Sequence, residues 1–152
     1  MSNLLVQNIK HTNNTTSMAI DTSGQVTIRG ESSATTTKLQ QGLAKAFSTV
    51  DQTSGASIDD SNNISGITDN RTGEVGLSFS NNMNNTLYSV TVSEREHNAD
   101  GNWVAGGFVV GAQATSGWNG TLSTSQYTVV NYVNNGAAHD SENSSVVHGD
   151  LA

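Results

Sequence analysis

The sequence contains neither cysteine nor proline. Disulfide bonds, thiol nucleophiles and thiolate metal sites are therefore excluded, and the absence of cysteine fits synthesis in a reducing compartment. Only 34% of the 152 residues are hydrophobic and 5% are aromatic, which is little for a core that one chain builds alone. Because charged residues are also few, at 12%, the composition does not indicate disorder. We expect one compact domain with a short arm, completed by association with copies of itself.

Basic residues are missing from the last third of the chain. The last one is Arg95, whereas acidic residues continue as far as Asp150, and the net charge is −7. A surface without cations cannot neutralise phosphate groups, so neither nucleic acid nor an anionic membrane surface is expected as a partner. The sequence also lacks an apolar run of transmembrane length and a basic-then-apolar leader. We therefore expect no membrane insertion.

Asn, Ser and Thr together make up more than a third of the chain. Clusters of these residues separate short segments in which apolar and polar residues alternate. The clearest pattern lies in 64–92, where apolar and polar residues alternate over 75–79 and again over 88–92. Polar clusters at 69–73 and 81–85 separate these segments and are rich in Asn and Gly, which favour turns. Strict alternation predicts an antiparallel meander with one buried face and one face in water.

Further strand signals flank this meander. They are a short segment over 4–9, a hairpin over 18–28 that turns at Asp21–Gly24, a nearly continuous apolar run over 103–111, a strand over 127–133 and a last strand over 145–148. Polar loops are expected at 94–102, 113–120 and 134–144, and the apolar run is expected to be buried on both faces. Leu39, Leu43 and Phe47 recur every four residues, which favours one short helix near 36–46, although Phe47 also fits a strand.

These signals predict an all-β fold. We expect an antiparallel β-sandwich or a jelly-roll-like module, with an N-terminal β-hairpin arm. The predicted divisions are an arm over 1–30, a linker with a short helix or a first strand over 31–57, and the sandwich over 58–152.

The motifs of common enzymes are absent. The sequence has no phosphate-binding Gly-x-x-x-x-Gly-Lys-Ser/Thr loop, no Gly-x-Gly-x-x-Gly and no Gly-x-Ser-x-Gly. Asp69 and Glu74 flank one turn and are the best pair of carboxylates for glycan cleavage, but both are expected on the wet side of that turn. We predict that the protein is not an enzyme and needs no cofactor.

Two polar clusters contain residue types that can bind metals. Two imidazoles and three carboxylates occur within 139–142 and 148–150, and they would suit zinc or manganese if they converged. The oxygen-rich segment 59–63 would suit calcium, but it lacks the glycine and the final glutamate of the helix–loop–helix calcium loop. Solvated loops and a polar turn are the favoured interpretations, so no metal is expected.

Two tryptophans are open to a binding role. Trp118 lies beside Asn119 in a predicted turn, where a flat ring can stack on a sugar or on a protein partner. Trp103 precedes the apolar run, where a place in the core is favoured. For Trp118, core and binding surface remain equal alternatives.

Three stretches of the sequence carry a family resemblance. The opening VQNIKHTNNTTSMAIDTSGQVTI leads through a Thr-rich bridge to a hairpin of the form "AMTIDSSGRV". The middle, KLQQGLAKAF and then DSNNISGITDNRTGEVGLSFSNNMNNTLYSV, follows the patterns "AKAW", "SITDNGTGDYTVNF" and "NYSV", and the chain closes on VVHGDLA. In this order the three stretches resemble fibre and virion structural proteins of tailed bacteriophages that infect marine bacteria.

The chain also departs from this family pattern. Phe47 stands where tryptophan is common, Arg71 and Gly76 replace smaller or strand-favouring residues, and Asn84 lies where proline is frequent. Residues 94–143 match no part of the pattern, as expected of the variable, partner-facing part of such a protein.

The resemblance implies a virion protein, made in the host cytoplasm, that assembles as a homotrimer. A fibre or fibre-tip protein involved in host attachment is the first expectation, and a capsid decoration, collar or tail-joining protein without host contact is the alternative. The N-terminal arm would bind other virion proteins through its apolar residues, which are Leu4, Val6, Ile9, Met18 and Ile20. Host glycan or protein would be bound through the three polar loops, with Trp118, Asn119 and Trp103 as candidate contacts.

Overall fold

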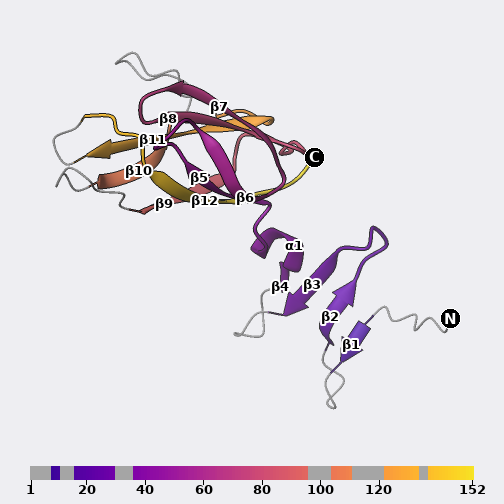
Figure 1. Cartoon of the computed structure of the whole chain (residues 1–152). Coiled ribbons are helices and arrows are strands. Elements are labelled where there is room, and N and C mark those ends of the chain that lie inside the picture. Colours follow the sequence, from indigo (N-terminus) through magenta and orange to yellow (C-terminus); the bar gives the residue numbers. More distant parts are fainter. Residues whose placement is uncertain (1–7, 11–15, 30–35, 96–103, 111–121, 134–136) are drawn as a thin grey trace. The chain divides into compact units, whose positions relative to one another are not determined.

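The computed structural model describes residues 8–10, 16–29, 36–95, 104–110, 122–133 and 137–152 (Figure 1). The chain forms two compact units, Met1–Leu43 and Ala44–Ala152. The sequence had suggested boundaries after residues 30 and 57, whereas the structure has one boundary, after Leu43. The difference arises because the strand over 36–38 pairs with the N-terminal strands, while the strand that begins at residue 46 belongs to the second unit.

The N-terminal unit is a four-stranded antiparallel sheet in the order β1-β2-β3-β4. Its elements are β1 (Asn8–Lys10), β2 (Thr16–Ile20), β3 (Val26–Arg29), β4 (Thr36–Lys38) and the single helical turn α1 (Leu39–Gly42). The predicted hairpin is confirmed as β2 and β3. Its turn is closed by Asp21, whose Oδ1 accepts hydrogen bonds of 2.9 Å from the backbone nitrogens of Ser23 and Gln25. The predicted helix is reduced to one turn, since Phe47 lies in the next strand.

The second unit is a sandwich of two four-stranded antiparallel sheets, so the predicted all-β class is confirmed. One sheet has the order β10-β11-β8-β7 and the other β6-β5-β12-β9 (Figure 1). The strands are β5 (Ala46–Asp51), β6 (Ser57–Asn62), β7 (Ile64–Arg71), β8 (Glu74–Phe79), β9 (Ser89–Arg95), β10 (Val104–Val110), β11 (Gln126–Val133) and β12 (Glu142–His148). The predicted loop over 134–144 is therefore wrong at its end, because β12 begins three residues before position 145.

The predicted meander is only partly correct. β7 and β8 form the expected hairpin, but β9 crosses to the other sheet and pairs with β12. The segment between β8 and β9 is held across the two sheets: the backbone nitrogen of Met83 donates to Thr124 O at 2.8 Å, and the Tyr88 hydroxyl donates to Ser123 O at 2.8 Å. Alternation in the sequence predicted which residues face inwards but not which strand becomes the neighbour.

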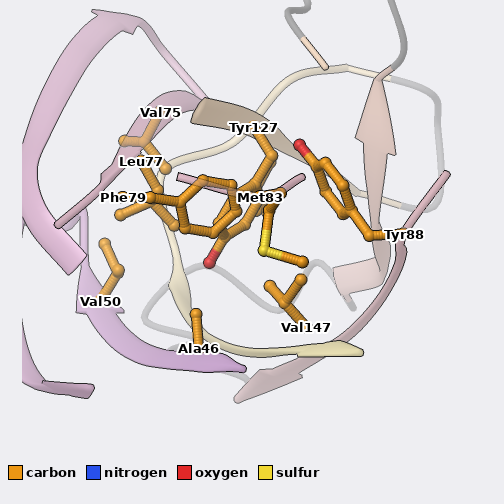
Figure 2. Packing of buried hydrophobic residues seen from close by; sticks show 10 residues of the cluster. Ala46, Val50, Val75, Leu77, Phe79, Met83, Tyr88, Tyr127 and Val147 are labelled. Carbon is orange, nitrogen blue, oxygen red and sulfur yellow. The ribbon is translucent and has the colours of Figure 1, made fainter. Parts of the chain in front are cut away.

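The core lies between the two sheets (Figure 2). Its fully or nearly fully buried apolar side chains are Ala46, Val50, Val75, Leu77, Phe79, Met83, Tyr88, Tyr127, Val129 and Val147. Phe79 packs edge-on against Tyr88, with ring centroids 5.7 Å apart. Inside this apolar layer the Tyr127 hydroxyl lies 2.7 Å from Ser145 Oγ, and Ser145 Oγ lies 2.8 Å from Ser48 Oγ. The three hydroxyls satisfy one another, as buried polar groups require.

Burial on both faces occurs in β11, where every residue over 127–131 is buried. Burial on both faces was predicted instead for the apolar run over 103–111. The strand is confirmed there as β10, but the burial of its side chains is not described. The prediction of one wet face fails at one residue of β8. Glu74 alternates with the core residues and yet is fully buried, whereas Gly76 and Ser78 on the same face are half-buried.

The two ends of the sandwich are formed by different segments of the chain. At the entry end, where the chain enters the unit, Lys45 N donates to Val147 O at 2.7 Å, and the C-terminal residues pair with 82–84. At the far end lie the β7–β8 turn at Gly73, the end of β11 and the start of β12. There Gly73 N donates to Asp140 Oδ1 at 2.6 Å, which joins the turn to the segment before β12.

Candidate functional site

One face of the N-terminal sheet is apolar from strand to strand. The register pairs Ile9 of β1 with Met18 of β2, and Met18 with Ile28 of β3. One step along the same face, Ile20 pairs with Val26. Residues directly opposite each other in an antiparallel pair share a face, as do residues two positions apart in a strand. These five side chains, here called the apolar face, therefore form one continuous surface.

None of the residues 8–10, 16–29, 38, 39, 42 and 43, for which the N-terminal unit has a described burial, is buried. Ile9 is 53% and Ile20 37% exposed, and Met18, Val26 and Ile28 are half-buried. On the other face of the sheet, Asn8 pairs with Ala19, Ala19 with Thr27, and Thr27 with Lys38, so that face is mostly polar. The four strands form a single layer, and within the described part of this unit no second sheet packs on the apolar face.

This arrangement is suited to binding a surface, because apolar side chains gathered on one sheet face stabilise the unit only when they leave water. A unit of 43 residues is close to the size below which folds need disulfides, metals or association. Disulfides are excluded by composition. The described side chains of the apolar face carry no charge, so an apolar partner can cover them without burying an unpaired charge.

The structure brings together three of the five residues that the sequence predicted for attachment. Ile9, Met18 and Ile20 lie on the apolar face, whereas Leu4 and Val6 lie outside the described residues. The prediction missed Val26 and Ile28. The signal for both was present, since they alternate within the same hairpin and stand across the turn from Met18 and Ile20.

The candidate host contacts Trp103, Trp118 and Asn119 lie outside the described residues. The strand between them is nevertheless informative. β10 begins at Val104, which pairs with Val133 at the far end, and it ends at Val110, which pairs with Thr128 towards the entry end. The segments 96–103 and 111–121 therefore join the sandwich at opposite ends, so the three predicted contact loops do not all join one end.

The two groups of residues considered as metal ligands do not converge. Residues 139–142 lie at the far end and residues 148–150 at the entry end, because they are at opposite ends of β12. β12 has seven residues, so its two ends are about 20 Å apart. No group of three or more His, Asp or Glu side chains able to hold a metal occurs in the part of the chain that the structure describes. Asp140 has a different role, since it accepts the Gly73 hydrogen bond.

The segment 59–63, which was expected as a polar turn and considered for calcium, is mostly strand. Its first four residues lie in β6, the edge strand next to β5. The register between the two strands shifts at Asp59, which indicates a β-bulge there. Asp59 and Asp60 are both exposed, as acidic side chains on an edge strand commonly are.

The two carboxylates at the β7–β8 turn differ in their exposure to solvent. Asp69 is exposed, but Glu74 is fully buried, so the prediction that both lie on the wet side is wrong. Glu74 Oε2 accepts a hydrogen bond of 2.7 Å from Arg71 Nε and Oε1 accepts one of 3.2 Å from Asn70 Nδ2. These bonds compensate the charge for its loss of water. Glu74 is therefore a structural carboxylate that a glycan cannot reach.

Within the described ranges, no helix has the length and apolar character needed to cross a membrane. Comparison of the chain with protein-family models, with curated proteins and with solved structures gives no match in any of the three.

Proposed function

We propose that this chain is a structural protein of a tailed-bacteriophage particle, in the form of a trimeric fibre or fibre-tip protein that takes part in host attachment. The observation that carries the proposal is the apolar face of the N-terminal sheet, whose five side chains are exposed or half-buried. A single-layer sheet of this kind is completed by a partner. In this proposal the partners are other virion proteins and the other copies of the chain.

The family resemblance supports the same division of roles. The opening stretch, VQNIKHTNNTTSMAIDTSGQVTI, includes β1, β2 and β3 of the N-terminal unit. The central stretch supplies β6, β7 and β8, and VVHGDLA begins in β12 and runs to Ala152 at the entry end. The N-terminal unit is accordingly the part that attaches, and the sandwich is the part that is presented.

The size of the apolar face favours several copies acting together. Full burial of a Val, Ile or Met side chain stabilises by about 1.5–3 kcal/mol, and the five side chains here are already partly covered. One face therefore gains a few kcal/mol, which is comparable with the cost of about 4–15 kcal/mol for association. Three linked copies bind with a much higher effective affinity than one, because the second and third contacts are intramolecular.

The far end of the sandwich is proposed to face the host. The chain reaches the sandwich at Lys45, so within this unit the far end is the end most distant from the attachment. The segments 96–103 and 134–141 join strands at the far end, and they are part of the stretch that departs from the family pattern.

Immunogold labelling of intact particles tests the proposed function. Antibody raised against residues 44–152 should place gold on the purified particles of the phage that encodes the chain, at the ends of tail fibres. Gold on the head or the collar would instead assign the alternative role of a capsid decoration, collar or tail-joining protein. Particles without gold, from lysates that contain the protein in free form, would contradict a virion role altogether.

A further inference from the structure

Three buried amide side chains meet at the far end of the sandwich. Gln52 follows β5, Asn131 lies near the end of β11 and Asn143 lies near the start of β12. Gln52 is 4%, Asn131 0% and Asn143 1% exposed. Gln52 Oε1 accepts hydrogen bonds from Asn131 Nδ2 and from Asn143 Nδ2, the latter at 3.3 Å. The cluster thus joins a strand of one sheet to two strands of the other.

Each of these amides keeps one polar atom without a partner. The unpaired atoms are Gln52 Nε2, Asn131 Oδ1 and Asn143 Oδ1. The hydroxyl oxygen of Ser141, two residues before Asn143 and fully buried, is also unpaired. Leaving a buried donor or acceptor unpaired costs about 1–3 kcal/mol for each group. Three such atoms in one hydrogen-bonded cluster indicate that the site holds something that supplies the missing hydrogen bonds.

Rotating the amides does not remove the deficit. If all three are turned over, Gln52 Nε2 donates to the two asparagine oxygens, and Gln52 Oε1 and both Nδ2 groups become unpaired. In either orientation the free atom of Gln52 is of the opposite kind to the free atoms of Asn131 and Asn143. A ligand that satisfies all three must therefore both donate and accept hydrogen bonds.

Water has this property, and a metal ion does not. A cation would be coordinated by the amide oxygens but repelled by the remaining N–H groups, and the three amides carry no charge to compensate its loss of water. The atoms are close enough for one or two water molecules. The dimensions of the amide groups and of the hydrogen bonds between them place Asn131 Oδ1 and Asn143 Oδ1 within about 7 Å of Gln52 Nε2. One bridging water spans up to about 6 Å.

We infer that Gln52, Asn131 and Asn143 form a binding site for internal water between the two sheets at the far end. Buried water typically makes about three hydrogen bonds to groups that are otherwise unpaired, and these residues offer that number. The water links the residue after β5 and the start of β12 to the end of β11. This inference is independent of the proposed function, since it concerns the sandwich alone.

Water-to-protein NOE spectroscopy of the full-length 15N-labelled protein tests the inference. We expect cross-peaks from the water resonance to the side-chain amide protons of Gln52, Asn131 and Asn143, with the sign of long-lived water. The Ser141→Ala variant is the control for magnetisation relayed through the Ser141 hydroxyl, and the amide cross-peaks should persist in it. Absence of the cross-peaks in the wild-type protein would overturn the inference.

A second measurement separates water from a metal and does not depend on one variant folding. In a crystal structure of the full chain at about 1.5 Å resolution, a density peak should lie 2.7–3.2 Å from the free atom of Gln52 and from one asparagine. A peak with oxygen ligands at about 2.3–2.6 Å would show calcium instead. Direct pairing of the amides with protein groups would show a dry site. Either of these two results would overturn the inference.

Discussion

The side-chain oxygen of Asn63 accepts two hydrogen bonds from Asn81, one of 2.7 Å from its backbone nitrogen and one of 3.1 Å from its side-chain nitrogen. Asn63 stands between β6 and β7 with a φ of 58°, in the left-handed region. Its Nδ2 also donates to Lys45 O at 3.1 Å. One residue therefore turns the chain from one sheet to the other and holds the entry strand and the 80–88 segment in place.

Replacement of Asn63 should lower stability through two separable causes. Asn63→Ala loses the side-chain hydrogen bonds and also strains the left-handed backbone, so we expect a loss of about 2–3 kcal/mol. Asn63→Gly loses the same hydrogen bonds without that strain, and its loss should be about 1 kcal/mol smaller. Urea unfolding followed by tryptophan fluorescence measures both, because Trp103 and Trp118 both belong to the sandwich unit. Equal losses would show that the backbone conformation is not strained.

Gly73→Ala should destabilise the far end strongly. A Cβ at Gly73, which has a φ of 71°, would lie 2.7 Å from His139 N and 2.8 Å from Asn131 O, and both are backbone atoms that cannot move alone. We expect a loss of about 3 kcal/mol or more in urea unfolding. Gly55→Ala is the matched control, since Gly55 also has a positive φ, of 103°, but nothing within 4 Å of the added Cβ. A loss at Gly73 no larger than that at Gly55 would contradict the close contact.

The hydroxyl cluster in the core predicts an asymmetry between two variants. Tyr127→Phe leaves the bond of 2.8 Å between Ser48 and Ser145 intact, so the loss should be about 1 kcal/mol or less. Ser145→Ala removes the partner of both other hydroxyls, and Tyr127 Oη is then left only with Ser48 Oγ at 3.4 Å. We expect its loss to be about twice as large. A larger loss in Tyr127→Phe would show that the tyrosine hydroxyl is the centre of the cluster.

Alkaline pH should weaken the sandwich through Tyr88. Burial, and next the charge of Tyr127, raise the pKa of Tyr88 to about 12 from 10.0, while its hydrogen bond to Ser123 lowers the pKa. The folded-state pKa is raised, so the neutral form stabilises the fold fully below pH 10, and this stability is lost as the pH rises from 10 through 12. In Tyr88→Phe the decrease in unfolding free energy between pH 10 and 12 should be smaller than in the wild type. An unchanged decrease would assign the effect to other groups.

The sequence pattern was sufficient for some elements and not for others. The alternation of apolar and polar residues identified Val75, Leu77 and Phe79 as inward-facing. Apolar residues at every second position of a strand lie on the same face, and that face is the buried one. Alternation failed at β12, where Asn143 and Ser145 face inwards although polar residues are typical of loops. Polar residues can occupy core positions when other buried polar groups are in reach, and such groups come from distant strands that a local pattern does not reveal.

The same limit applies to the candidate site. Met18 and Ile20 were predicted from alternation within one hairpin, and the register adds Val26 and Ile28 across the turn. That the five side chains of the apolar face are exposed or half-buried could not be predicted. A pattern shows that a face is apolar, whereas the layer that covers it depends on the rest of the fold or on a partner.

Attachment through the apolar face is tested most directly by the amount of the protein in purified particles, measured by quantitative mass spectrometry for two matched variants. Ile28→Glu places a charge on the apolar face, whereas Thr27→Glu places the same charge on the opposite face, across from Lys38. Both substitutions lie in the N-terminal unit, so sandwich unfolding should be unchanged, and equal circular dichroism of the two variants should show that this unit is folded in both. We predict wild-type amounts in particles for Thr27→Glu and at least a tenfold decrease for Ile28→Glu. Equal incorporation of the two variants would contradict attachment through this face.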